Sequence, residues 1–275
     1  MVPFTNNRQV IYDLLTRAKT YHCPVTTSIQ LEVSALEEAR RRTRVEGRAV
    51  GLTAVMVKAT ALVQRAHPRF NHHMFHGLFG KYEYAFERVR CNMIVLKRGP
   101  DGERVLLPLI IEDADQRSVI EIQQQIDAVR RAPLESLPQF QAIERVKRLP
   151  RLLLRWFSYR VRSDHRAYER YFGTYGLSSM TSKQVSAHAL HTVANTAAAF
   201  LFGSVQRGPV VRGDAVVPGK LLNVALVADH YVLDGVDMVE GIRTLRNLLE
   251  HPGRLGLEVA AEGASEGGAD APVQP

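Results

Sequence analysis

The stretch LLNVALVADHYVLDGVDMVEG, residues 221–241, decides how the rest of this chain is interpreted. Its apolar first half predicts a buried strand, and its second half predicts a helix with apolar residues at helical spacing. His230 lies where the strand ends, a position from which an imidazole can face a cleft. Asp234 follows four residues later and can brace the loop, with Gly235 allowing a tight turn. The HxxxDG spacing is short, so it also fits a loop histidine beside a helix-capping aspartate.

The segments around this stretch alternate between strand and helix patterns. Residues 52–67 are apolar nearly all round, which predicts a buried helix that ends before Pro68. Residues 90–98 and 103–111 flank a Gly-Pro-Asp-Gly turn and predict a hairpin. We expect Gly47 to end a charged helix over 35–47. Further strands are predicted at 25–33, 175–180 and 199–205, and further helices at 7–19, 119–132 and 235–253.

Composition places the chain among ordinary globular proteins. It has 275 residues, 45% of them apolar and 23% charged, which excludes a disordered chain, a collagen and a disulfide scaffold. With only two cysteines, Cys23 and Cys91, and no signal-peptide pattern, we expect a reducing, cytoplasmic compartment. We expect one domain over residues 1–254 and a disordered acidic, Gly- and Ala-rich tail over 255–275.

The formal net charge of +8 is concentrated in one segment. Residues 145–170 hold nine Lys/Arg and two Asp/Glu, whereas the rest of the chain is close to neutral. No zinc-finger, RNP or basic-zipper pattern accompanies the segment, so nucleic acid is not expected as a partner.

Three segments together resemble one enzyme family. They read VALVADHYVLDGVDMVEGIRTLRNLLEHPGRL, LTAVMVKATALVQRAHPRFN and GPDGERVLLPLIIEDADQRSVIEIQQQI. They are similar to segments of the acyltransferase catalytic domain of 2-oxoacid dehydrogenase complexes and of its relative chloramphenicol acetyltransferase. Along the chain they follow the same order as in that family, and the resemblance extends over about residues 8–253. The resemblance implies an α/β, two-layer α+β sandwich with a mixed central sheet and flanking helices.

The resemblance also implies a chemistry: transfer of an acetyl or other short acyl group from acyl-CoA, as cosubstrate, without a covalent acyl-enzyme. The matching His230 would be the general base that deprotonates the acceptor. A serine of YGLSSM would stabilise the oxyanion, with Ser178 first and Ser179 second. The relatives are trimers, so His230 would meet Ser178 of a neighbouring chain in a homotrimer.

The remaining site residues are also implied by the resemblance. Asp234 would pair with Arg8 and hold the loop, while Asn195 keeps the family's place in the loop after the serine. His22 and Cys23 match the segment that lines the acceptor side. Tyr231 replaces the arginine that usually follows the catalytic histidine, which puts the lipoamide substrate most in doubt.

We expect a stand-alone enzyme that acts on a small-molecule hydroxyl or thiol, because this chain shows no lipoyl attachment site, Ala/Pro-rich linker or peripheral-subunit-binding domain. One alternative is a trans-acting dihydrolipoamide acyltransferase core, assembled into a larger cage, whose lipoyl domain lies on another chain. Another is a non-catalytic assembly protein that keeps the fold.

The basic segment departs from the family pattern. Residues 148–162 predict an amphipathic helix. Its two faces carry Arg148, Arg151, Arg155 and Arg162 on one side and Leu149, Leu153, Trp156 and Phe157 on the other. A subunit-interface helix, a peripheral membrane contact and a basic rim for CoA phosphates all fit this pattern.

No metal is expected. His72, His73 and His76 fall in a predicted turn, and His188 and His191 are spaced i, i+3. Neither group has the added cysteine or carboxylate ligands of a zinc site.

Overall fold

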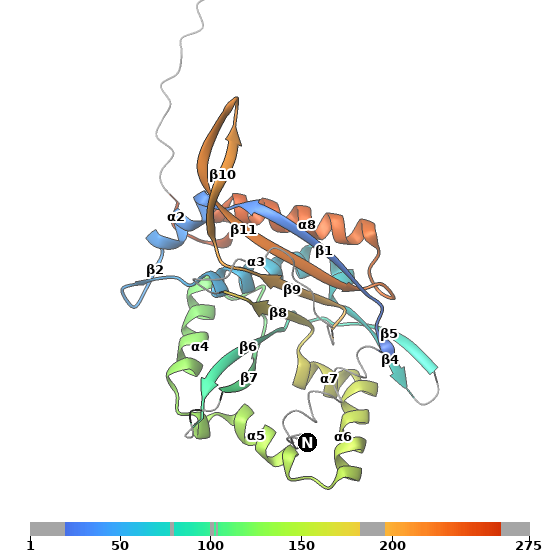
Figure 1. Ribbon diagram of the computed structural model, residues 1–275. Coiled ribbons are helices and arrows are strands. Elements are labelled where there is room, and N and C mark those ends of the chain that lie inside the picture. The colour runs from blue at the N-terminus through green and yellow to red at the C-terminus, as the bar shows by residue number, and fades with distance from the viewer. Residues whose placement is uncertain (1–19, 78–79, 100–101, 103, 182–195, 260–275) are drawn as a thin grey trace, which may run out of the picture.

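A seven-stranded mixed sheet forms the centre of the protein (Figure 1). The computed structural model describes residues 20–77, 80–99, 102, 104–181 and 196–259. The strand order is β1-β11-β9-β8-β6-β7, and β10 pairs with the first half of β11. Strands β6, β8 and β9 run parallel to one another, and the other pairs are antiparallel. The strands are β1 (Pro24–Glu32), β6 (Cys91–Arg98), β7 (Arg104–Ile111), β8 (Tyr175–Ser179), β9 (Ala198–Phe202), β10 (Gln206–Arg212) and β11 (Ala215–Asp229).

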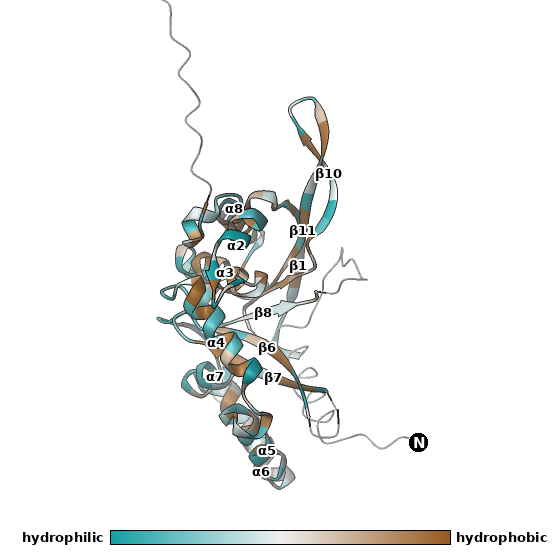
Figure 2. Ribbon diagram, turned by 90° about the vertical axis from the view of Figure 1, so that its left-hand side faces the viewer, coloured by the Kyte–Doolittle hydropathy of each residue, from teal (hydrophilic) through white to brown (hydrophobic). Residues whose placement is uncertain are grey.

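Helices cover one face of this sheet (Figure 2). On that face lie α2 (Ser34–Arg42), α3 (Leu52–Ala66), α4 (Val119–Arg131) and α8 (Gly235–Glu250). The α4 helix begins with a capping box, in which Ser118 and Glu121 satisfy each other's backbone N–H groups. The result is the two-layer, mixed-sheet α/β architecture that the sequence predicts.

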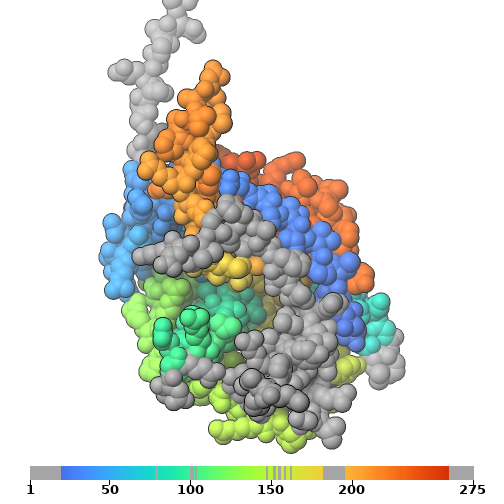
Figure 3. Space-filling model, in the orientation of Figure 1, coloured from blue at the N-terminus to red at the C-terminus, as the bar shows by residue number. Residues whose placement is uncertain are grey.

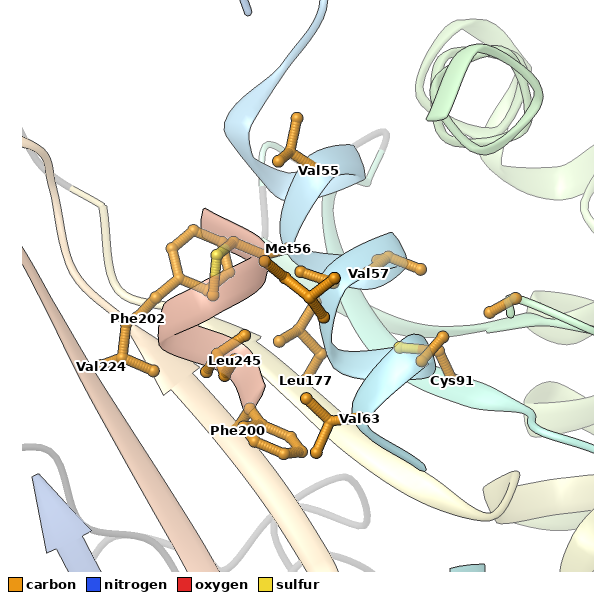
Figure 4. Close-up of a cluster of buried hydrophobic side chains, with 14 of the residues drawn as sticks. Val55, Met56, Val57, Val63, Cys91, Leu177, Phe200, Phe202, Val224 and Leu245 are labelled. Carbon is orange, nitrogen blue, oxygen red and sulfur yellow. The ribbon is translucent and has the colours of Figure 1, made fainter. Parts of the chain in front are cut away.

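The core lies between α3, α8 and the sheet (Figure 4). Both faces of α3 are buried, as its apolar sequence requires: Val57 and Val63 are fully buried. They pack with residues of β8, β9 and α8, among them Leu177, Phe200 and Leu245. A Cβ at Gly241 would overlap the Phe70 ring, so this glycine allows α8 to approach the turn after α3 closely.

Two smaller antiparallel pairs correct the sequence predictions. The predicted helix over 35–47 ends at Arg42, and Gly47 (φ +75°) instead lies in the turn between β2 (Arg44–Val45) and β3 (Arg48–Ala49). The histidine-rich segment is β4 (His72–Gly77), paired with β5 (Gly80–Ala85), and not a turn. Alternation explains this, because His73 and Phe75 are buried while their neighbours are less buried.

The helix predicted over 148–162 is observed at Arg151–Ser163, and the basic segment also includes the end of one helix before it and most of another after it. The three helices are α5 (Pro138–Lys147), α6 (Arg151–Ser163) and α7 (His165–Phe172). Arg148 is the C-cap of α5, so it does not share a helix face with the arginines after Pro150. Contrary to the expectation from the sequence, Trp156 and Phe157 do not share one apolar face. Trp156 is 62% exposed, whereas the Phe157 ring packs edge-on against Tyr171 at 5.4 Å.

Two extensions leave the body at opposite ends. The β10–β11 hairpin projects from one end, as the space-filling view shows (Figure 3). Helices α5 and α6 lie at the other end (Figures 1 and 2). Three 3₁₀ turns, η1 (Pro68–Asn71), η2 (Leu134–Ser136) and η3 (Pro252–Leu255), complete the described structure.

Candidate active site

The candidate site is the loop between β11 and α8, held against the start of β1. Antiparallel pairing sets Pro24 opposite Asp229, the last residue of β11. The ladder continues one step further, because the His230 N–H donates to the Cys23 carbonyl oxygen at 2.8 Å. The segment that contains His22 and Cys23 therefore flanks the histidine loop.

The imidazole of His230 is fixed at one nitrogen. Its Nδ1 lies 2.9 Å from the Leu233 carbonyl oxygen, a partner that can only accept a hydrogen bond, so Nδ1 carries the proton. In the neutral tautomer with the proton on Nδ1, the lone pair is on Nε2. His230 is exposed in the single chain, so this nitrogen is accessible to a proton donor. The geometry is that of a general base.

Asp229 orders the backbone on both sides of the histidine. Its carboxylate is 2% exposed, and Oδ2 lies 2.5 Å from the His22 Nδ1. Oδ1 accepts from the Cys23 N–H at 3.0 Å and from the Tyr231 N–H at 3.2 Å. Burial acts to raise the pKa of Asp229, but these hydrogen bonds outweigh it and hold the pKa below its ordinary value. Sequence reasoning treated Asp229 as the strand end and missed this role.

Asp234 caps helix α8. Its Oδ1 accepts from the Val236 N–H at 2.9 Å and the Asp237 N–H at 3.1 Å, and the Asp234 N–H donates to Asp237 Oδ2 at 3.0 Å. The hydrogen bond from Asp237 is the main reason why the pKa of Asp234 is lowered. Gly235 is the first residue of α8 with open space around its α-carbon and no positive φ. The expected need for glycine in a tight turn is therefore wrong.

Arg69 holds the loop from the η1 turn. Its Nη2 donates to the Val232 carbonyl oxygen at 2.9 Å, and its Nη1 lies 3.3 Å from Asp237 Oδ2. The expected partner of Asp234, Arg8, lies outside the described residues, as does Asn195. In the sequence, the HPRFN segment indicates the end of a helix at its proline and carries part of the family resemblance, but it gives Arg69 no role.

The structure does not bring Ser178 next to His230 within one chain. Ser178 pairs with Leu201 on β9, and Leu201 pairs with Ala225 on β11. His230 lies five residues beyond Ala225, roughly 16 Å along the strands and two strands away. Both residues can therefore act on one carbonyl only if they come from different chains.

The other predicted residues lie around these two positions. Tyr231 is 57% exposed beside His230, and Cys23 is a free, exposed thiol. Ser179 is exposed and donates from Oγ to the Thr181 hydroxyl at 3.2 Å. Ser178 is half-buried on the opposite face of β8. Within the described ranges, no group of three or more His, Cys, Asp or Glu side chains could hold a metal ion.

A mixed sheet with helices on one face and an exposed histidine at a strand end are the features that the sequence predicts for an acyltransferase catalytic domain. The family model described as 2-oxoacid dehydrogenases acyltransferase (catalytic domain) matches residues 1–137 and 186–257, well over half of the chain. The chain belongs to this family, which confirms the resemblance drawn from its sequence. Residues 138–185, which contain α5, α6, α7 and β8, lie outside the match.

Two curated relatives match part of the chain. The lipoamide acyltransferase component of the branched-chain α-keto acid dehydrogenase complex of Pseudomonas aeruginosa is 44% identical over 50 residues. The dihydrolipoyllysine-residue succinyltransferase component of the 2-oxoglutarate dehydrogenase complex of Arabidopsis thaliana is 38% identical over 56 residues. These matches cover 18% and 20% of this chain and 12% of each relative.

Solved structures match nearly the whole fold. The Azotobacter vinelandii dihydrolipoamide acetyltransferase gives a TM-score of 0.66 at 21% identity, over 94% of this chain and 93% of that one. A probable dihydrolipoamide acetyltransferase from Listeria monocytogenes gives 0.65 at 16%, over 91% and 94%. The cubic core of a pyruvate dehydrogenase multienzyme complex gives 0.65 at 20%, over 94% and 93%. These likenesses confirm the predicted fold class.

Proposed function

We propose that this chain transfers a short acyl group between coenzyme A and the thiol of a dihydrolipoyl group on another chain, with His230 as general base. The exposed His230, whose Nδ1 hydrogen bond to the Leu233 carbonyl leaves Nε2 available to an acceptor, carries the proposal. The sequence alone favoured a free small-molecule acceptor. The names of the two curated relatives, a lipoamide acyltransferase and a dihydrolipoyllysine-residue succinyltransferase, favour the dihydrolipoyl acceptor instead.

Residue spacing supports the roles of Ser178 and Asp234. The description of the Azotobacter structure names a serine, a histidine and an asparagine in its catalytic mechanism, with the serine 52 residues before the histidine and the asparagine four after it. Ser178 precedes His230 by 52 residues, and Asp234 follows it by four. Asp234 differs in charge, but its observed role, accepting backbone N–H groups, is one that an asparagine oxygen can also perform.

In the proposed step, His230 Nε2 takes the proton of the acceptor thiol as its sulfur attacks the thioester carbonyl carbon of acyl-CoA. The carbonyl oxygen becomes an oxyanion and accepts a hydrogen bond from the Ser178 hydroxyl of a neighbouring chain. The carbon–sulfur bond to CoA then breaks, and the CoA thiolate takes the proton from His230. The carbonyl of Leu233 keeps the ring in the required tautomer throughout.

A homotrimer with three such sites completes the proposal. The distance between His230 and Ser178 in one chain supports it, since each chain would give its histidine to one neighbour and its serine to the other. Further assembly into a cage, as in the cubic core among the similar structures, is compatible with this arrangement.

Co-expression of His230→Ala and Ser178→Ala chains with different tags tests the shared site. A hybrid trimer contains one site in three with an intact histidine and an intact serine. We therefore expect tandem-purified hybrids to recover about one third of wild-type turnover, although each parent loses at least about 100-fold. Hybrids as inactive as their parents would refute the shared site, provided that both parents form oligomers of the wild-type size.

A second assay distinguishes the acceptors. Tyr231, exposed where the family has an arginine, favours a free small-molecule acceptor as the second candidate. Release of CoA from acetyl-CoA is measured with free dihydrolipoamide, with a dihydrolipoylated domain, and with a panel of small thiols and alcohols. Turnover with the small panel alone would replace the dihydrolipoyl acceptor by the second candidate.

A further inference from the structure

The helices at the end of the molecule are not explained by acyl transfer. Helices α5, α6 and α7 lie in residues 138–185, which the family model does not match. Among the described residues no helix is long and apolar enough to cross a membrane. An exposed helix that is both apolar and basic therefore needs another explanation.

Helix α6 is apolar on two sides. On its inner side Val161 is buried and the Phe157 ring packs against Tyr171 of α7. On its outer side Leu153, Trp156 and Tyr159 follow one another at i, i+3 spacing and are 50%, 62% and 40% exposed. We call these three residues the outer stripe. Trp156 is the only tryptophan of the chain.

The outer stripe lies in the most basic part of the protein. Of the two acidic residues in 145–170, Asp164 pairs with Arg160 at 3.0 Å, and Glu169 pairs with Arg90 at 3.2 Å. Arg148 and Arg166, just before and just after α6, are exposed. Neither has a carboxylate partner among the residues that the structure describes, so this end of the molecule keeps a surplus of positive charge.

We infer that the outer stripe and its flanking arginines bind the surface of an anionic lipid bilayer. Leucine, tryptophan and tyrosine side chains bury favourably at the boundary between head groups and acyl chains, and arginines there pair with anionic head groups. Acidic proteins or CoA phosphates would account for the arginines alone, but a lipid surface accounts for the arginines and for the exposed apolar side chains of the outer stripe. Helix α6 lies at one end of the molecule (Figure 1), and the three side chains of the outer stripe are exposed.

The single tryptophan makes the test specific. The full chain is mixed with vesicles of phosphatidylcholine alone or with added phosphatidylglycerol, and Trp156 emission and co-flotation are measured. We expect a shift to shorter wavelength and flotation with the anionic vesicles only, both reduced by salt. The test is independent of the proposed function, because acyl transfer is assayed without lipid.

Two variants locate the contact. Arg148→Gln with Arg166→Gln should weaken binding to anionic vesicles by roughly 30-fold, from about 1 kcal/mol for each arginine. Leu153→Asp should abolish the emission shift, with circular dichroism and acyl transfer reporting on its fold. The matched control is Arg207→Gln with Arg243→Gln, which removes the same charge from exposed positions on β10 and α8.

Several outcomes would overturn the inference. These are no emission shift with anionic vesicles, an equal shift with neutral vesicles, or equal weakening of binding by the control pair. A shift produced by acetyl-CoA or by poly-glutamate without lipid would assign the surface to that ligand instead. Emission that is already blue-shifted in the protein alone would assign the outer stripe to contact between copies of the chain.

Discussion

Arg69 and Val232 connect the turn after α3 to the loop that contains His230: the guanidinium Nη2 donates to the Val232 carbonyl oxygen at 2.9 Å. The same side chain reaches Asp237 at the start of α8. Val232 lies between His230 and Leu233, whose carbonyl holds the imidazole. Arg69 therefore holds the loop of His230, the proposed base, through Val232 and Asp237.

Replacing Arg69 by methionine should lower kcat about tenfold and leave the KM for acetyl-CoA nearly unchanged, because the base loses its alignment. Stability should fall by less than about 1 kcal/mol, since the ion pair is half exposed. Steady-state kinetics measure the first effect and urea unfolding the second. Arg243→Met, on the exposed side of α8, is the control. An unchanged kcat would show that the loop holds its shape without Arg69.

Replacing Asp229 by asparagine should destabilise the protein by about 3 kcal/mol at pH 7, because it breaks a buried pair with His22. Since the pKa of Asp229 is lowered, the contribution is complete above about pH 4 and is lost as the pH falls further. Urea unfolding of Asp229→Asn, His22→Asn and the double variant measures the coupling. If the two losses simply add, the pair is not their source.

His73 should make the protein sensitive to mild acid. Burial lowers its pKa from 6.5 to about 3, with His22 and His76 adding to the effect and Asp229 opposing it. This histidine stays neutral in the folded protein but becomes protonated in the unfolded chain. The folded protein therefore loses stability as the pH falls below 6.5.

The free energy of unfolding should therefore drop by about 2 kcal/mol more in the wild type than in His73→Phe between pH 7 and pH 5. Phenylalanine keeps the ring that stacks on Tyr168 at 4.3 Å. Parallel curves for the two proteins would contradict the assignment. His72→Phe is the control at the neighbouring, less buried position.

Asp234 should tolerate asparagine but not alanine. Asparagine keeps an oxygen for the Val236 and Asp237 N–H groups. The free energy of unfolding should therefore stay close to that of the wild type, and kcat should stay within about twofold. Alanine removes the cap and should cost about 1 kcal/mol, together with part of kcat. Thermal unfolding measures the loss of stability in each variant, and steady-state kinetics measure the loss of kcat. Equal losses in both variants would show that the charge matters rather than the cap.

The regular elements of the fold could be predicted because their patterns are local. The helix predicted at 52–67 is observed at Leu52–Ala66, and the hairpin at 90–98 and 103–111 is observed at Cys91–Arg98 and Arg104–Ile111. Strand β4 was missed because its three histidines suggested a turn, whereas its burial depends on contacts with Tyr168, far along the chain. Long-range packing of this kind leaves no periodic signal in so short a strand.

The site was predictable where residues are neighbours in sequence and not where they are distant. The loop from His230 to Asp234 follows from its own motif and from the strand and helix on either side. The hydrogen bonds of Arg69 to Val232 and of His22 to Asp229 span 163 and 207 residues. Such contacts depend on the register of β1 with β11 and on the position of η1, which no local spacing specifies.

The strand register that keeps Ser178 away from His230 has a consequence for the newly made protein. Under the proposed pairing, a single translated chain holds two half-sites and no whole one. Cellular thioesters would then be safe from hydrolysis or misdirected transfer by unassembled chains. Specific activity would rise with protein concentration and lag behind folding after dilution from denaturant, at a rate set by encounters between subunits.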